Sequence, residues 1–403
     1  MDSRSTPLEI TPPFQKKGGV TSRFAGLSLT GSTWAEIDLG ALVRNFKEIK
    51  KRVGSDVGVM AIVKAQGYGH GMVQISRALE KEGVNYFGVT SPSEAFLLRK
   101  EEIESAILIL GPTMLEKASG IIEKDITQTI CTKEIALALA EECKRLKKRL
   151  KIHIEVDTGM GRTGVPHQRA LKLIKEVVKI PELEVEGIFT HFSTADEEDK
   201  SFTKEQIRRF KEVLEKLKGE KADIPLRHAA NSAGALNFPE SYFNMVRPGL
   251  ALYGIYPSEY VSRSLDLHPV MSLKSKVIYL KRVKKGATIS YGKTYVTNKN
   301  TTIAILPIGY EDGYNRLLSN QGEVIIRGKR VRIAGRVCMD QTIIDVGEVS
   351  DVEVGDEVVL IGEQGRERIS VEEIAKKVNT VPHEVVCRIA GRVPRIYLKN
   401  SNQ

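Results

Sequence analysis

Residues 57–91, VGVMAIVKAQGYGHGMVQISRALEKEGVNYFGVTS, contain two short apolar runs separated by an amphipathic segment. The runs at 57–64 and 86–91 have the length and composition of buried strands, and the segment between them has the apolar spacing of a helix. A strand followed by a helix and a second strand predicts a parallel sheet.

The same alternation continues to about residue 255. Further apolar runs lie at 107–111, 127–132, 151–158, 185–191, 226–232 and 246–254. Eight buried strands that alternate with helices predict a parallel (β/α)8 barrel. A doubly wound open sheet is the alternative, but no GxGxxG motif follows the first run.

After about residue 268 the pattern changes to short β-type segments separated by Gly, Asp and Lys-Gly turns. These segments predict a mostly antiparallel β-domain that ends in one helix at 371–379 and an extended tail. The predicted organisation is therefore a flexible N-terminal arm (1–32), a barrel (33–268) and a C-terminal β-domain (269–403).

Composition narrows the classes of function. Hydrophobic residues make up 41% of the 403 residues and charged residues 28%, as in globular proteins. No run of about 18 apolar residues exists, so we expect no transmembrane helix and no membrane partner. The net charge of +10 is not gathered into a basic patch with interleaved aromatics, which argues against nucleic acid. Four cysteines without a CxxC pair, and seven histidines without ligand spacing, favour a cytoplasmic protein with neither disulfides nor a metal.

Barrel enzymes place their active sites at the carboxyl ends of the strands. Several predicted strands end there in polar or cationic residues. These residues are Lys64, Arg162, His191, Asn231, Ser232 and Arg247, and Arg247 is followed by Gly249 and Leu250 at the same end. A lysine at such a rim can simply reach solvent, so the sequence around Lys64 has to decide between that interpretation and a functional one.

The segment VKAQGYGHG (63–71) closely resembles VKADAYGHG, the cofactor-lysine motif of alanine racemases. Further family-like motifs follow in matching order as far as Tyr397. They are AEIDLGALVRN (35–45), DTGMGRTGV (157–165), THFSTADE (190–197), AANSAGAL (229–236), NMVRPGLALYGI (244–255), SYG (290–292), PIGYEDGY (307–314), RVCMDQ (336–341) and RVPRIY (392–397). The chain thus resembles the alanine racemase family over nearly its whole length.

The resemblance implies a pyridoxal 5′-phosphate (PLP) enzyme in which Lys64 holds the cofactor as a Schiff base. PLP withdraws electrons from the substrate Cα, so the protein supplies proton carriers and orientation. Interconversion of L-alanine and D-alanine, for peptidoglycan synthesis, needs a base on each face, and the family pattern assigns these roles to Lys64 and Tyr291. In the family this tyrosine comes from the second subunit, which implies a homodimer with shared sites. A tyrosine that simply packs in the β-domain is the alternative.

Other roles are implied by matching positions. The residues implied to contact the cofactor are Tyr68, His191, Asn231, Ser232, Arg247, Gly249 and Leu250. Arg247 would face the pyridine nitrogen and, because an arginine stays protonated, would leave that nitrogen unprotonated. The residues implied to receive the amino-acid substrate are Arg162 and, from the partner subunit, Met339, which is flanked by Cys338 and Asp340.

Two positions depart from the common family pattern. Many members carry a carbamylated lysine where this chain has Glu155. Strand alternation points Glu155 into the barrel, where a carboxylate needs a partner such as Arg162. We hypothesise that Glu155 supplies the negative charge of the carbamate directly; an unrelated strand glutamate is the alternative. Gly391 stands where members often have a tyrosine near the entrance, which predicts more room and a substrate range that extends to serine.

Three alternatives stay open. A racemase of broader specificity would differ only in its pocket residues. A basic amino-acid decarboxylase also joins a barrel to a β-domain, but its histidine-rich strand and Gly-rich phosphate loop are not found in this sequence. A non-catalytic PLP-binding protein would be the barrel alone, whereas this chain adds a second domain with Tyr291.

Overall fold

The computed structural model describes residues 31–219 and 224–398. The predicted N-terminal arm (1–32) therefore lies almost entirely outside the described residues. Eight parallel strands form the first sheet: β2 (Gly58–Ile62), β3 (Tyr86–Val89), β4 (Ala106–Ile109), β5 (Thr127–Ile130), β6 (Leu150–Asp157), β8 (Leu183–Phe189), β9 (Leu226–His228) and β10 (Met245–Val246). Because β10 pairs with β2 and β5 pairs with β6, the sheet closes on itself. The predicted (β/α)8 barrel is confirmed, and one strand overlaps each of the eight apolar runs, although only Val246 of the run 246–254 belongs to its strand.

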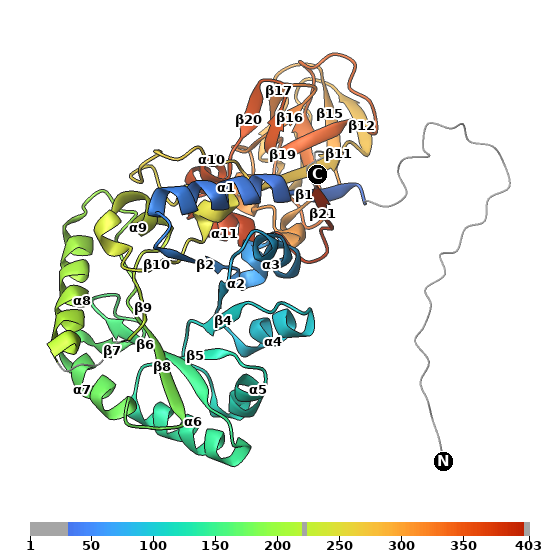
Figure 1. Cartoon of the computed structure of the whole chain (residues 1–403). Coiled ribbons are helices and arrows are strands. Elements are labelled where there is room, and N and C mark those ends of the chain that lie inside the picture. The colour runs from blue at the N-terminus through green and yellow to red at the C-terminus, as the bar shows by residue number, and fades with distance from the viewer. Residues whose placement is uncertain (1–30, 220–223, 399–403) are drawn as a thin grey trace, which may run out of the picture. The chain divides into compact units, whose positions relative to one another are not determined.

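Helices surround the barrel strands (Figure 1). They are α1 (Leu39–Val53), α3 (Met72–Lys81), α4 (Pro92–Lys100), α5 (Ala118–Glu123), α6 (Lys133–Leu146), α7 (His167–Val177), α8 (Ser201–Gly219) and α9 (Ser232–Asn237). In α8 the buried residues Ile207, Phe210, Val213 and Leu217 recur every three or four positions and face the core. Each such buried side chain stabilises the fold by about 1.5–3 kcal/mol. The two-residue strand β7 (Val165–Pro166) pairs in parallel with the carboxyl end of β6.

The second part of the chain forms the β-domain. Its large sheet has the order β17-β16-β19-β11-β1-β21 with β20 beside β19, its small sheet has the order β12-β15-β18, and β13 pairs with β14. The strands are β11 (Met271–Lys276), β12 (Tyr279–Val283), β13 (Thr288–Ile289), β14 (Tyr295–Val296), β15 (Thr301–Leu306), β16 (Glu323–Ile326), β17 (Lys329–Arg332), β18 (Thr342–Asp345), β19 (Glu357–Gln364), β20 (Glu367–Ile369) and β21 (Arg395–Leu398). All pairs of this domain are antiparallel except β1 with β21, which confirms the predicted β-domain.

Two features of this domain differ from the prediction. The first strand, β1 (Thr33–Asp38), was assigned with the barrel but is hydrogen-bonded between β11 and β21 in the large sheet of the β-domain. The C-terminal region was expected to contain one helix and an extended tail. It contains two helices, α10 (Val371–Lys377) and α11 (Pro382–Cys387), and the tail is the strand β21. The exact domain boundaries stay a prediction.

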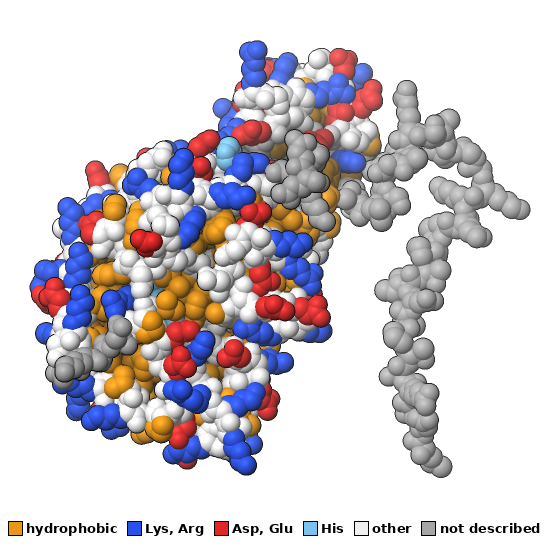
Figure 2. Space-filling model, in the orientation of Figure 1, with side chains coloured by type: hydrophobic (Ala, Val, Ile, Leu, Met, Phe, Trp, Pro, Cys, Tyr) orange, Lys and Arg blue, Asp and Glu red, His pale blue; other side chains and the backbone are white. Residues whose placement is uncertain are grey.

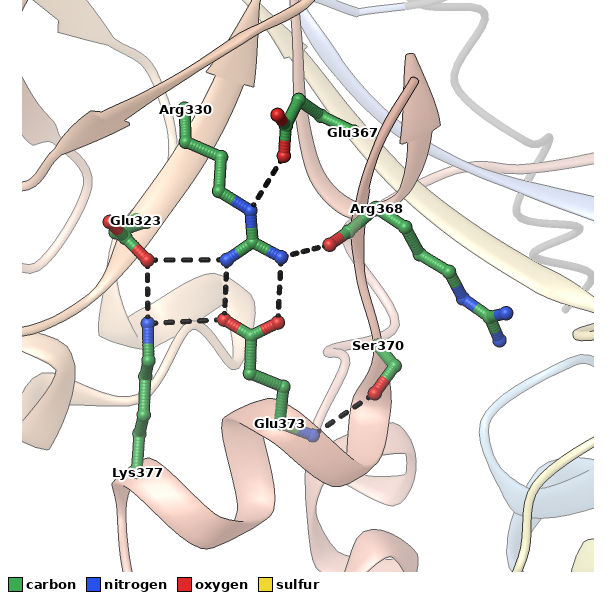
Figure 3. Close-up of polar contacts among 7 residues, drawn as sticks. All are labelled: Glu323, Arg330, Glu367, Arg368, Ser370, Glu373 and Lys377. Carbon is green, nitrogen blue, oxygen red and sulfur yellow. Dashed lines mark hydrogen bonds and ion pairs between the residues drawn. The ribbon is translucent and has the colours of Figure 1, made fainter. Parts of the chain in front are cut away.

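An ion-pair network fastens α10 to the large sheet (Figure 3). Arg330 of β17 contacts the carboxylates of Glu323, Glu367 and Glu373 at 2.8–3.2 Å, and its Nη2 donates to the carbonyl of Arg368. Lys377 pairs with Glu323 and Glu373 as well. The network therefore fixes the position of α10 on the sheet. The helix α11 begins five residues after the end of α10.

Charges on the surface are mixed in sign. On the face drawn in Figure 2, lysine and arginine side chains are interspersed with aspartate and glutamate. On helix surfaces these form pairs such as Arg208 with Glu205 and Arg145 with Glu142. Of the helices in the described ranges, none combines the length and apolar character needed to cross a membrane.

Candidate active site

A cavity of about 370 Å³ opens at the carboxyl ends of the barrel strands. Its lining includes many of the residues that the sequence predicted for the site. These are Lys64, Tyr68, Glu155, Arg162, His191, Asn231, Ser232, Arg247, Gly249 and Leu250. The cavity is also lined by residues that sequence reasoning did not single out, among them Thr90, Asp196 and His383.

Lys64 stands before a left-handed turn. Residues 65–68 all have φ between 51° and 61°, a conformation that costs about 1–2 kcal/mol for each non-glycine residue. Neighbouring groups hold the turn in place, since Ala65 N–H donates to Glu94 Oε1 at 2.7 Å. Strained backbone of this kind persists where the surroundings over-determine it, commonly at functional sites. The turn places both Lys64 and Tyr68 on the cavity wall.

The surroundings of Lys64 favour its neutral form. Burial lowers the pKa of the Lys64 amine, the charge of Arg162 lowers it further, and Glu94 opposes both. A lysine whose pKa is lowered in this way is a better nucleophile near neutral pH.

Arg247 is 3% exposed and anchored on several sides. Its Nη2 donates to the carbonyl oxygens of Thr190 and Ala229 at 2.8 and 3.0 Å and lies 3.2 Å from His191 Nδ1. Its Nη1 lies 2.9 Å from His228 Nδ1. Burial lowers the pKa of Arg247 to about 10, so the guanidinium stays charged at neutral pH. Because an arginine only donates, a neutral His191 accepts at Nδ1 and carries its proton on Nε2.

A cup of neutral hydrogen-bonding groups, formed by Ser232, Gly249 and Tyr68, also lines the cavity. Ser232 Oγ accepts from the N–H groups of Gly249 and Ala251 at 2.9 and 3.2 Å, which leaves its own hydrogen free to donate. A Cβ at Gly249 would lie 2.5 Å from the Tyr68 hydroxyl, so only glycine admits that phenol. Asn231 caps α9 by accepting from a backbone N–H at 2.9 Å rather than facing the cup with its side-chain oxygen.

Glu155 is 3% exposed, and burial raises its pKa. Its nearest polar partners are the Cys131 thiol, with Sγ 3.6 Å from Oε2, and the Thr163 side chain. Arg162 lowers the pKa of Glu155 through its charge. The expected pair of Glu155 with Arg162 thus acts through the electric field, while the thiol and the hydroxyl make the hydrogen bonds.

Tyr291 and Met339 lie outside the lining of the cavity in their own chain. Their side chains are 69% and 52% exposed on the β-domain. Their loops are joined, because Ser290 Oγ donates to the Arg336 carbonyl at 2.7 Å and lies 3.6 Å from Cys338 Sγ.

The other predicted β-domain residues also lie away from the cavity. Asp340 accepts from Arg392 Nη2 at 2.6 Å. Gly391 does not line the cavity of its own chain, and a Cβ there would meet no atom within 4 Å; the wider entrance that we expect at Gly391 stays a prediction. The cavity residue of this region is His383 of α11, whose ring centroid lies 5.8 Å from that of Tyr68. The signal in the sequence is a histidine directly after Pro382, which begins α11; a prediction of an extended tail does not use this signal.

Comparison with known proteins agrees with this geometry. The family models for the N-terminal and C-terminal domains of alanine racemase match residues 37–257 and 270–397. Alanine racemase 2 of Caldanaerobacter subterraneus subsp. tengcongensis is 49% identical over 91% of this chain and 95% of its own length. The alanine racemase of Halothermothrix orenii is 46% identical over 92% of this chain and 97% of its own length.

Solved structures are similar along the same length. The alanine racemase of Clostridium difficile 630 superposes with a TM-score of 0.88 at 40% identity, covering 93% of this chain and 97% of that one. The alanine racemase of Bacillus anthracis with bound L-Ala-P superposes with a TM-score of 0.86 at 39% identity, covering 92% and 96%. The chain therefore belongs to the alanine racemase family of isomerases.

Proposed function

We propose that this chain interconverts L-alanine and D-alanine with PLP as its cofactor and so supplies D-alanine for peptidoglycan. The observation that carries the proposal is the convergence of Lys64, Arg247 and the Ser232–Gly249 cup on one cavity. An aldehyde, a ring nitrogen and a phosphate are the binding groups of PLP. The cavity offers them an amine, a guanidinium and a set of neutral donors, so the residues present fit the cofactor.

PLP, when bound, withdraws electrons from the substrate Cα and makes its proton removable. Lys64 Nζ would take or return that proton on one face, and the partner's Tyr291 would do so through its phenol oxygen on the other. The Nε2–H of His191 would donate to that oxygen and stabilise its deprotonated form. Arg162 would orient the substrate carboxylate, and Glu155 would supply the negative charge that a carbamylated lysine supplies elsewhere in the family.

The β-domain supports a shared site in a homodimer. Tyr291 and Met339 are large, exposed and carried by two loops that are bonded together. A surface of this kind suits cover by a second subunit, and two-fold symmetry would then complete both sites at once. The four cysteines are unpaired, in keeping with the cytoplasmic location that we predict.

Proton exchange tests the activity. The purified protein with PLP should convert L-alanine into D-alanine in deuterated water and place deuterium at Cα, whereas Lys64→Ala should do neither. Bound cofactor without exchange would indicate a PLP-binding protein instead. A panel with serine tests the broader specificity that we predict from Gly391.

Subunit mixing tests the shared site. Lys64→Ala and Tyr291→Phe should each be inactive alone. After mixing and exchange of subunits, about a quarter of the wild-type activity should return, because half of the dimers are hybrids with one intact site. No recovery, with exchange verified by mass, would contradict the partner's contribution.

A further inference from the structure

A chain of buried polar side chains runs through the barrel interior below the cavity. His228 and His153 are both 0% exposed. Arg247 Nη1 lies 2.9 Å from His228 Nδ1, and His228 Nε2 lies 2.9 Å from His153 Nδ1. His153 Nε2 then lies 3.2 Å from Glu186 Oε2. None of these three residues beyond Arg247 has a role in the proposed reaction.

The chemistry of the two ends sets the direction of every bond. An arginine can only donate, and a carboxylate can only accept. Because His228 accepts from Arg247 at Nδ1, its proton lies on Nε2 and is donated to His153. By the same step His153 carries its proton on Nε2 and donates it to Glu186. Burial lowers the pKa of both histidines, which keeps them neutral and keeps this single order of protons.

Glu186 is held as an anion at the far end. Tyr86 donates its hydroxyl to Glu186 Oε2 at 2.7 Å, and Lys151 Nζ lies 3.3 Å from Oε1. The Glu186 side chain is 15% exposed. Burial alone would raise its pKa, but the hydrogen bonds from His153 and Tyr86 outweigh burial and lower the pKa to about 2.

Arg247 needs a counter-charge that its immediate neighbours do not provide. Within the described ranges its hydrogen bonds go to carbonyl oxygens and to histidine rings, and none goes to a carboxylate. Glu155 acts on it only through its field. A buried cation is costly unless a negative charge compensates it. The carboxylate that a continuous line of hydrogen bonds connects to Arg247 is Glu186.

We propose that His228, His153 and Glu186 form a directional relay that orients Arg247 and supplies its counter-charge through the barrel interior. The relay rests on the proposed function, because its purpose is to hold Arg247 against the pyridine nitrogen of PLP. The negative end makes His228 a stronger acceptor and so raises the affinity of Arg247 for its own protons. Arg247 would then donate a hydrogen bond to the bound cofactor without giving up a proton. His228, His153 and Glu186 are positioning residues.

Nitrogen NMR tests the proton order directly. In protein labelled with ¹⁵N-histidine, with and without PLP, His228 and His153 should each show a protonated Nε2 and an unprotonated Nδ1 across neutral pH. A His153→Gln variant assigns the signals. A proton on Nδ1 of either ring, or a charged ring, would overturn the relay, whether or not the protein is a racemase.

Removal of the distant charge tests its effect. Glu186→Gln keeps the shape and removes the charge, and Glu184→Gln, at an exposed position two residues earlier in β8, is the matched control. Glu186→Gln should shift the resonance of His228 Nδ1. It should also lower kcat about three- to tenfold and leave KM for alanine little changed, as expected when one charge is removed at the distance that separates Glu186 from Arg247. The control should change neither. An unmoved His228 resonance in Glu186→Gln, or an equal effect in both variants, would overturn the proposal. Loss of racemisation in the wild type would refute the proposed function but leave the NMR test of the relay standing.

Discussion

Gly249→Ala is the substitution whose effect the structure defines most sharply. The new Cβ would lie 2.5 Å from the Tyr68 hydroxyl and 3.0 Å from Cζ. Ordinary contact begins at about 3.4 Å, so the phenol would have to move by about 0.9 Å. Tyr68 is 6% exposed and packs against Tyr253, with ring centroids 5.1 Å apart, so the ring has little freedom to move. Overpacking of this kind costs about 1–3 kcal/mol of folding free energy.

The same movement should weaken cofactor binding. A hydrogen bond to a charged group contributes about 1.5–3 kcal/mol, so losing the Tyr68 hydroxyl from the phosphate should raise the Kd of PLP about 10- to 100-fold. Titration of the apoprotein with PLP, followed by absorbance, measures the Kd, and thermal unfolding measures stability. Gly391→Ala is the matched control, because its Cβ would meet nothing within 4 Å. If Gly249→Ala binds PLP and unfolds like this control, the approach of Tyr68 is not what requires glycine.

Three further substitutions test other parts of the argument. Burial raises the pKa of Glu155, so the folded protein holds this proton more tightly than the unfolded chain, and stability falls as the pH rises above the ordinary value of 4.5. The Tm of Glu155→Gln minus the Tm of the wild type should therefore be larger at about pH 8 than at about pH 5. An equal difference at both pH values would refute the raised pKa of Glu155. An unchanged KM for alanine would refute the proposed role of Glu155 in replacing the carbamate. In a denaturant titration, Arg330→Met should lower the free energy of unfolding by about 1–3 kcal/mol, because its ion pairs are intermediate between exposed and buried pairs. Arg368→Met loses one exposed ion pair and should lower the free energy of unfolding by less than about 0.5 kcal/mol in the same titration. Gln66→Gly should raise the free energy of unfolding by about 1 kcal/mol, because Gln66 has a φ of 56°, which glycine adopts without strain. Gln74→Gly, at an exposed position inside the helix α3, should lower the free energy of unfolding by about as much. A change of the same sign in both variants would contradict the backbone strain at Gln66.

The barrel could be predicted from the sequence because each of its strands and helices is indicated by a local pattern of apolar residues. Each apolar run overlaps one barrel strand, although only Val246 of the run 246–254 lies in a strand, and the strands end at the face where the site forms. That is why Lys64, His191 and Arg247 could be placed on one face before the structure was known. The pairing of β1 with β11 and β21 could not be predicted from the sequence. These two partner strands lie more than 230 residues away from β1, and no pattern in the sequence of β1 indicates which strands it pairs with.

The helix α11 shows a second limit. Its six residues, PHEVVC, include two adjacent valines, which favour a strand over a helix. In the structure Pro382 begins the helix, and Val386, which is 0% exposed, packs into the core. Tertiary packing decides the conformation of so short a segment, because an isolated helix of this length is not stable. The position of His383 in the cavity follows from this packing, which no local pattern reports.

Charge explains why the cavity residues belong together. Lys64, Arg162 and Arg247 stand around one space, and the charges of Arg162 and Arg247 both lower the pKa of Lys64. The carboxylates around them are Glu155, whose pKa burial raises, Asp196 in the cavity lining, and Glu94, which opposes the effect of the arginines on Lys64. A phosphate or a substrate carboxylate bound among the three cations would relieve their mutual repulsion. The repulsion that makes the lysine reactive therefore also favours anionic ligands.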